Sequence, residues 1–375
     1  MTIIFLGLLI YALYILHNYI YRRFWTNGLT VNIKFSAKEA FEGDKLHLTE
    51  EITNRNFLPL PWLYLSFRMS SNLVFLDETQ PDEEIDDSET SGIVNQNELF
   101  SVMMYRSIRR QVAFLCSRRG VYRLERVNLS TYNLLHTARF TKDFKAVNQL
   151  VVFPQIISIA ELEILYKKLD AEILSHQLIN PDPFEFRGIR EYVPTDPANT
   201  VNFKATAVSQ QLMVNIHAPI SSKRLNIILN LEPYTAYPDR ELYENSIRMC
   251  ASVAQHYILD NVNVSFATNG RDIASREEIR LLEGASTAHL YSIFEALARI
   301  DLSYKAAPMH EYIGNIKDYE SVYLIISAYH KEDLMEACEY LRNRGGTAFL
   351  VIPTTNAKDV ELNQTEYVSV WEVGS

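Results

Sequence analysis

One short stretch of the chain concentrates charged side chains around several prolines. Glu185, Arg187, Arg190, Asp196 and Lys204 all fall within it. Paired carboxylates can act as general acid and general base when their surroundings separate their pKa values. Arginines that meet carboxylates in two-pronged hydrogen bonds can instead lock an irregular backbone in place. Catalysis, partner binding and a structural connector are therefore the alternatives, and we favour the connector.

Two further expectations follow from the connector interpretation. Tyr192 and Phe203 are expected to anchor it in apolar pockets, because an irregular segment needs side chains to fix it. Arg190 is expected to be a partly buried partner of the nearby carboxylates. Its loss would then leave an unpaired buried charge and destabilise the protein strongly.

The common catalytic and cofactor motifs are missing from the rest of the sequence. No two glycines lie two residues apart, and neither a phosphate-binding loop nor a G-x-S-x-G elbow occurs. His310-Glu311 is followed by Tyr312, so it does not begin a zinc-binding H-E-x-x-H motif. The three cysteines are far apart, which indicates reduced, structural thiols. These absences predict a protein without a cofactor that is not an enzyme.

Charge excludes a further class of function. The 36 Lys and Arg residues face 46 Asp and Glu residues, for a net charge of −10, and eight of the acids lie between Asp77 and Glu89. That acidic stretch is expected to be a solvated loop. The rest of the chain is close to neutral, so a basic face for nucleic acid is not expected.

The first segment of the chain is long and apolar enough to cross a membrane. Residues Thr2–Tyr21 carry no charged side chain, and Arg22 and Arg23 follow them. The positive-inside rule then predicts a single-pass anchor over residues 1–23, with the body of the protein in the cytoplasm. Tyr19, Tyr21 and Trp25 are expected to form an interfacial aromatic belt. A cleaved signal peptide and a buried core helix are the alternatives.

Three regions are expected after this anchor, in a multi-domain chain that contains both helices and strands. Short alternating strands over residues 29–155 predict a β-sandwich. Residues 156–222 are expected to form a helical linker, with a helix near 159–174, followed by the irregular charged segment. Apolar strands alternate with amphipathic helices over residues 223–375, which predicts an α/β domain with a mostly parallel sheet.

The charged segment also resembles the signature of a bacterial membrane-protein family known as domain of unknown function 58. The matching positions run from Glu185-Phe186 through Arg190-Glu191-Tyr192 and Asp196 to Asn202-Phe203-Lys204, and Leu212-Met213-Val214 follows as an L-x-V strand. The resemblance implies that the last domain is a Rossmann-like von Willebrand factor A domain. It also implies a protein partner, a MoxR-type AAA+ ATPase. It makes the following signature residues possible partner contacts: Glu185, Phe186, Arg187, Arg190, Tyr192, Asp196, Asn202, Phe203 and Lys204.

The chain departs from this family at its metal site. Von Willebrand A domains often hold Mg²⁺ through a D-x-S-x-S turn after the first strand of the sheet. Here Asn230, Glu232 and Tyr234 occupy the corresponding positions. The sequence therefore predicts a degenerate site without metal, and a non-catalytic, membrane-anchored adaptor in envelope-related assembly. A metal-dependent binding module with an altered cage and a membrane-bound enzyme of unknown reaction are the alternatives.

Overall fold

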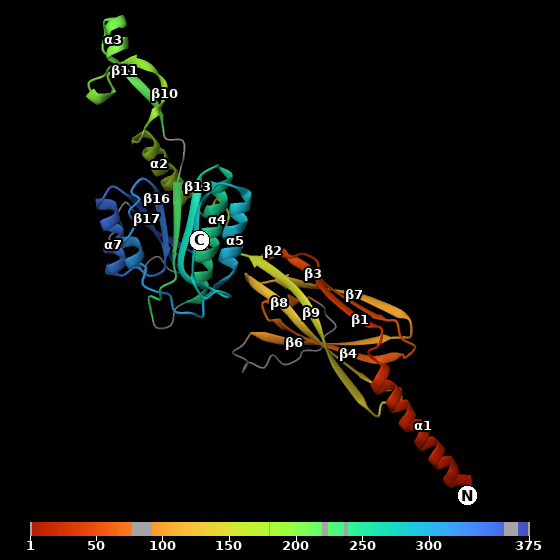
Figure 1. The fold of residues 1–375 in the computed structure, drawn as a ribbon. Helices are drawn as coiled ribbons and strands as arrows, with labels where there is room; N and C mark the ends of the chain where they lie inside the picture. Colours follow the sequence, from red (N-terminus) through yellow and green to blue (C-terminus); the bar gives the residue numbers. More distant parts are fainter. Residues whose placement is uncertain are drawn as a thin grey trace. The chain divides into compact units, whose positions relative to one another are not determined.

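The chain folds as two compact units, Met1–Gln155 and Ile156–Ser375 (Figure 1). The structure is a computed structural model that describes residues 2–76, 92–179, 181–219, 224–235, 239–355 and 367–373. The acidic stretch expected to be a solvated loop lies outside these residues. The division between the units falls where the sandwich was expected to end.

The first unit contains the helix α1 (Thr2–Phe24) and two β-sheets. The four-stranded sheet has the order β1 (Leu29–Phe35), β3 (Lys45–Asn54), β7 (Arg106–Cys116), β5 (Leu73–Phe75). The five-stranded sheet has the order β2 (Glu39–Phe41), β9 (Arg139–Phe153), β8 (Gly120–Tyr132), β4 (Leu60–Ser70), β6 (Ile93–Val102). Neighbouring strands run antiparallel except β2 and β9, which are parallel. This confirms the predicted β-sandwich.

Alternation of apolar and polar side chains explains why these residues form sheets with a shared core. In β4, Leu63, Leu65, Phe67 and Met69 are buried, and the residues between them are more exposed. Successive side chains of a strand point to opposite faces, so this pattern places one face of the sheet in the core.

The helix α1 is attached to this core at its C-terminal end. From Ile3 to Phe24 it is long and apolar enough to cross a membrane. Tyr21 is only 1% exposed and Trp25 only 4%, and both belong to the sandwich core. The Tyr21 hydroxyl donates to the carbonyl oxygen of Pro59 at 2.9 Å. The expected aromatic belt is therefore wrong for Tyr21 and Trp25, because the sandwich offers these rings an apolar site. Tyr19 is exposed.

The second unit is built on a sheet with the order β14-β13-β12-β16-β17-β18. Its strands are β12 (Arg224–Asn230), β13 (Asn263–Asp272), β14 (Glu278–Gly284), β16 (Val322–Ser327), β17 (Thr347–Thr354) and β18 (Val368–Glu372), and the two-residue β15 (Ile300–Asp301) pairs with β13. β14 and β15 are antiparallel to β13, and the other pairs are parallel. Counted from β12 and without β15, the spatial order is 3-2-1-4-5-6, that of doubly wound sheets.

Helices pack on both faces of this sheet. The helices are α2 (Glu163–Ile179), α4 (Arg240–Leu259), α5 (Thr287–Ala298), α6 (His310–Gly314) and α7 (Glu332–Asn343). α4 and α5 lie together on one face, and α6 and α7 share an apolar cluster with the other (Figure 1). Strands covered on both faces are apolar throughout, as in β16, where every residue is buried.

The helix α2 is a packed part of this unit, so the expected helical linker is wrong at this point. The ring centroid of Tyr166 lies 4.2 Å from that of His256 in α4. The Asp170 carboxylate accepts a hydrogen bond from the Tyr257 hydroxyl at 3.0 Å. Lys168 donates to the Ser369 hydroxyl of β18 at 2.7 Å. The apolar face from which this helix is predicted is thus the face that packs against the rest of the unit.

The signature segment is more regular than expected. β10 (Pro181–Glu191) and β11 (Met213–Pro219) form an antiparallel two-stranded sheet, and the 3₁₀ turn η1 (Ala198–Thr200) and the helix α3 (Phe203–Ser209) lie between them. This ribbon was not expected from the sequence, because the segment contains several prolines and proline is usually unfavourable in a strand. In a two-stranded ribbon each strand keeps a free edge, where proline removes no ladder hydrogen bond.

Candidate functional sites

Polar side chains meet at the carboxyl ends of the parallel strands. β12 ends at Asn230 and β16 ends at Ser327, and these two residues are register partners. Asn269 lies near the end of β13, on the other side of β12. All three are buried. Ligand sites of doubly wound sheets lie at this edge, where the strand order reverses.

These three side chains use their polar atoms on one another and on nearby backbone. The Asn230 amide nitrogen donates to the Ser327 hydroxyl at 3.0 Å, and the Asn269 amide nitrogen donates to Asn230 Oδ1 at 2.7 Å. Asn230 Oδ1 also accepts from the backbone N–H of Glu232 at 3.0 Å. An amide oxygen has two acceptor positions, and both are occupied here.

The donor set at this turn does not suit Mg²⁺. The Asn230 oxygen is saturated by two N–H donors, and the Ser327 hydroxyl donates to the Tyr329 carbonyl at 2.6 Å while it accepts from the Tyr329 N–H. Among the described residues, no group of three or more His, Cys, Asp or Glu side chains is placed to hold a metal ion. The buried network is neutral, whereas Mg²⁺ is usually bound through one or two carboxylates.

Glu232 lies beside this network and not inside it. Its carboxylate accepts a hydrogen bond from the Met309 backbone N–H at 3.4 Å. Burial raises the pKa of Glu232, and the nearby Asp333 carboxylate adds to the effect. Asp333 itself accepts hydrogen bonds from the Tyr329 hydroxyl at 2.8 and 3.0 Å and lies 3.4 Å from His310 Nδ1.

Tyr234 forms the outer surface of the same edge. Its ring stacks on His330, with centroids 4.3 Å apart, and the Lys331 ammonium lies 5.7 Å from the Tyr234 centroid. Because Tyr234 is partly exposed and stacked outward, it does not enter a cation cage.

A cleft of about 580 Å³ adjoins this edge through Asn269 and Met309. Polar side chains line it, among them Thr268, Glu278 and Arg280, and the Arg280 guanidinium lies 4.7 Å from the centroid of the Tyr312 ring. This cleft was not expected from the sequence, because β14, which supplies Glu278 and Arg280, and α6, which supplies Tyr312, were not among the expected elements.

The signature residues lie on the β10–β11 ribbon and on α3, and their polar members pair with one another. Arg190 donates from two nitrogens to both oxygens of Asp196, each at 2.6 Å. The Asn202 side chain caps α3 by accepting from the Ala205 N–H at 2.9 Å and donates to Asn215 at 2.6 Å. The side chains of Glu185 and Arg187 lie outside the described part of the chain. Lys204 is exposed on α3.

The expected arginine–carboxylate pair is present and partly buried, with the Asp196 side chain 11% exposed. The Arg190 side chain is 45% exposed. The hydrogen bonds from Arg190, followed by the Val193 N–H, lower the pKa of Asp196 to about 2. Asp196 is therefore ionised at neutral pH and does not serve as a proton donor there.

The apolar signature residues face solvent. Phe203 is 78% exposed, which contradicts its expected role as an anchor in an apolar pocket, whereas Tyr192 is half-buried. A two-stranded ribbon with one short helix has too little apolar surface of its own to cover such a ring. Among the described residues, the large apolar side chains exposed on this segment, which we call the signature surface, are Phe186, Ile189, Val193, Phe203, Val208, Leu212 and Ile216.

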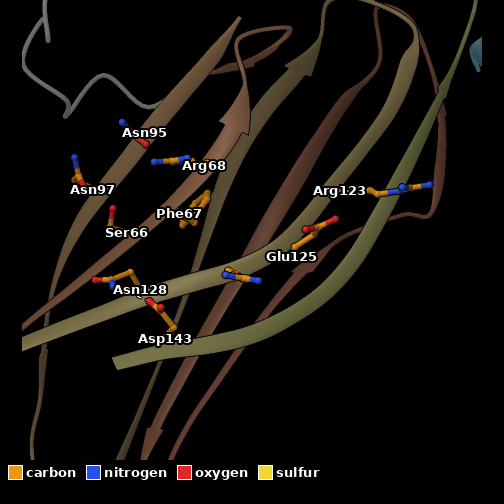
Figure 2. A pocket seen from close by; sticks show the side chains of 10 residues that line it. Ser66, Phe67, Arg68, Asn95, Asn97, Arg123, Glu125, Asn128 and Asp143 are labelled. Atoms are coloured by element: carbon orange, nitrogen blue, oxygen red, sulfur yellow. Dashed lines mark hydrogen bonds between the residues drawn. The ribbon is translucent and has the colours of Figure 1, made fainter. Parts of the chain in front are cut away.

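A second hollow lies on the sandwich, on the outer face of the five-stranded sheet (Figure 2). Its volume is about 690 Å³, and Arg68, Asn95 and Asn128 are among its lining residues. The Asn128 amide donates to Asp143 at 2.7 Å, and Arg68 is the register partner of Asn95. This hollow was not expected from the sequence, although alternate polar residues on β4, β6 and β8 are a signal for it.

The comparisons with known proteins identify no family. No family model matches the chain, and no curated protein matches it. Similar solved structures include the CARDB domain of a Pyrococcus furiosus protein in complex with di-metal ions, at 8% identity and a TM-score of 0.21, which covers 34% of this chain and 90% of that one. A non-cellulosomal cohesin from Archaeoglobus fulgidus is similar at 13% identity and a TM-score of 0.21, over 36% of this chain and 96% of that one. A PapD-like domain of human CEP192 is similar at 13% identity and a TM-score of 0.19, over 32% of this chain and 86% of that one.

Proposed function

We propose that this chain is a non-catalytic, membrane-anchored adaptor that binds a protein partner through its signature surface. The observation that carries this proposal is the exposure of seven large apolar side chains on the signature segment. Large apolar side chains that gather in the open on one segment indicate an interaction site more often than scattered single ones do.

The polar groups of the candidate sites support a binding role over a catalytic one. Asp196 is held ionised by Arg190, and Asn230 has no unused acceptor position. A general acid needs a pKa near the working pH, which Asp196 lacks. In this proposal the edge around Tyr234 and Lys331 is a second, smaller contact surface.

The resemblance of the signature to domain of unknown function 58 suggests the class of partner. It implies a MoxR-type AAA+ ATPase, and it implies that the second unit is a von Willebrand A-like module. The strand order of the second unit and the position of Asn230 at the end of its first strand support this likeness.

The anchor in this proposal is α1, with the body of the protein in the cytoplasm. The length and apolarity of α1 support a membrane span. Arg22 and Arg23 lie at its C-terminal end, which favours retention of that end on the cytoplasmic side.

The test is capture of a purified MoxR-type AAA+ ATPase by the detergent-solubilised full chain. Phe203→Asp combined with Val208→Asp places two charges on the signature surface and is expected to abolish retention of the ATPase. Leu282→Asp is the matched control, because Leu282 is also exposed but lies on β14. Retention of the ATPase by the double variant, with the wild-type melting temperature, would show that the signature surface is not the contact.

A further inference from the structure

Three loops of the sandwich gather around the C-terminal end of α1. The loop between β3 and β4 is tied to it by the hydrogen bond from Asn56 to the Phe24 carbonyl. The turn between β6 and β7 joins this loop, since the Tyr105 N–H donates to the Asn56 carbonyl at 3.3 Å. The turn between β8 and β9 joins from the other sheet, since the Asn133 amide donates to Asn18 of α1 at 2.5 Å.

Each of the three loops carries large apolar side chains that the protein leaves exposed. Tyr105 is 70% exposed, although its backbone holds a left-handed conformation with φ of 53°. We call this set the apolar rim, and its members are Phe57, Met103, Met104, Tyr105, Leu134 and Leu135. The rim therefore surrounds the position where α1 joins the sandwich.

Hydrogen bonds fix the depth of the rim along α1. The β8–β9 turn runs beside α1 before the helix ends, because the Asn133 amide is hydrogen-bonded to Asn18. From Asn18 to Phe24 the helix rises about 9 Å, at about 1.5 Å per residue. The hydrocarbon core of a bilayer is about 30 Å thick. If Ile3–Phe24 crosses that core, the β8–β9 turn, with Leu134 and Leu135, lies about 9 Å deeper than Phe24, which is the depth that interfacial apolar groups reach among the acyl chains.

Basic side chains accompany the rim. Arg22, Arg23, Arg55, Arg106 and Lys142 are exposed near this end of the sandwich, and Lys142 donates to the Thr26 hydroxyl at 3.3 Å. Long basic side chains keep their charge at the headgroups while their stems lie against apolar groups. Anionic lipid headgroups attract such a cluster.

We propose that the apolar rim inserts into the interfacial layer of the leaflet from which α1 emerges, and that the sandwich is thereby docked on the membrane surface. The inference rests on the proposed membrane span of α1. Its occupant is the lipid bilayer, because the rim is continuous with the apolar surface of α1 and carries basic side chains that match anionic headgroups.

The depth of single labelled positions tests this proposal. All three native cysteines are buried, so introduced cysteines can be labelled selectively. We would place an environment-sensitive fluorophore at Leu135→Cys and Met104→Cys on the rim, at Leu8→Cys in α1, and at Val147→Cys. Val147 is the matched control, because it is 90% exposed on β9, well beyond the turn. The full chain is reconstituted in vesicles of phosphatidylcholine and phosphatidylglycerol.

Lipids spin-labelled near the headgroup and aqueous iodide serve as the two quenchers. The probes on Leu135 and Met104 are expected to shift to the blue, to be quenched by the spin-labelled lipid and to resist iodide several-fold better than the probe on Val147. The probe on Leu8 is expected to resist iodide as well.

The other outcomes separate the two proposals. If the Leu8 probe is protected but both rim probes behave like Val147, the docked rim is wrong and the membrane span stands. Rim probes that resist iodide without quenching by the labelled lipid would indicate a protein contact and overturn the lipid occupant. If the Leu8 probe is open to iodide, α1 does not span the bilayer and both proposals fall.

Discussion

Glu50 is a carboxylate enclosed between the two sheets of the sandwich. It lies on β3 opposite Arg110 of β7, and Arg110 donates to Glu98 of β6 at 2.8 Å. Neither Glu50 oxygen has a hydrogen-bond partner in the part of the chain that the structure describes. Burial and then the neighbouring Glu98 raise the pKa of Glu50 to about 9, against the lowering effect of Arg110.

This raised pKa predicts that the sandwich loses stability as the pH rises. The folded protein holds a proton on Glu50 that the unfolded chain releases above about pH 4.5, so stability falls between that pH and about pH 9. Glu50→Gln keeps the neutral shape and is expected to raise the free energy of unfolding by about 1–3 kcal/mol at alkaline pH. Denaturant unfolding in detergent at mildly acidic and mildly alkaline pH measures this. Equal pH dependence of variant and wild type would contradict it.

The ion pair between Arg190 and Asp196 is partly exposed to water, because nearly half of the Arg190 side chain is accessible. Solvent screens such pairs, so Arg190→Ala is expected to leave the denaturant midpoint at neutral pH close to the wild-type value. The lowered pKa of Asp196 means that the contribution of the pair is present at neutral pH and disappears as the pH falls through about 2. A large drop of the midpoint at neutral pH would restore the buried connector that the sequence suggested.

The helix α1, the proposed membrane span, is attached to the sandwich through one face. Tyr21→Ala removes a ring from the sandwich core and is expected to destabilise the first unit by about 3–5 kcal/mol, as for other large aromatic deletions. Tyr19→Ala, two residues away and exposed, is the control and is expected to be nearly neutral. Equal unfolding midpoints of the two variants would show that α1 is not part of the core. A truncation that removes Met1–Arg23 loses the same ring, so it is not a neutral way to obtain the body of the protein.

Local patterns made most of the elements predictable from the sequence. Alternation in β4 and the unbroken apolar run of β16 identify half-buried and fully buried strands. The elements that were missed depend on distant partners. β10 is a strand because β11 pairs with it across an intervening helix, and Tyr21 is a core residue because the sandwich lies beside it. Neither relation leaves a periodic signal in the local sequence.

The sequence predicts where in the fold the candidate sites lie, but not which contacts their side chains make. The pattern of strands places Asn230 at the end of the first parallel strand, where a ligand site is expected. Its pairing with Asn269 depends on the alignment of β12 and β13, which sequence periodicity does not determine. Exposure of Phe203 likewise depends on what the ribbon packs against.

At the scale of the whole molecule, the unit boundary at Gln155 makes α2 part of the second unit. A fragment of residues 156–375 is therefore expected to fold and to melt cooperatively. A fragment that starts at residue 181 lacks α2 and is expected to melt at a markedly lower temperature, because Tyr257 and the apolar face of α4 around it lose their cover. Calorimetry measures the melting temperatures of the two fragments. Equal melting temperatures would show that α2 is a linker and not a packed part of the second unit.

The hydrogen bond from Tyr21 to Pro59 and the hydrogen bond from Asn133 to Asn18 hold α1 in a fixed orientation relative to the sandwich. A domain that is joined to its membrane anchor by a flexible linker can rotate independently of that anchor. Here a roll or tilt of α1 is also a roll or tilt of the sandwich. Helices tilt when their apolar length exceeds the local bilayer thickness. If α1 spans the bilayer as proposed, lipid composition sets the angle between the sandwich and the membrane surface.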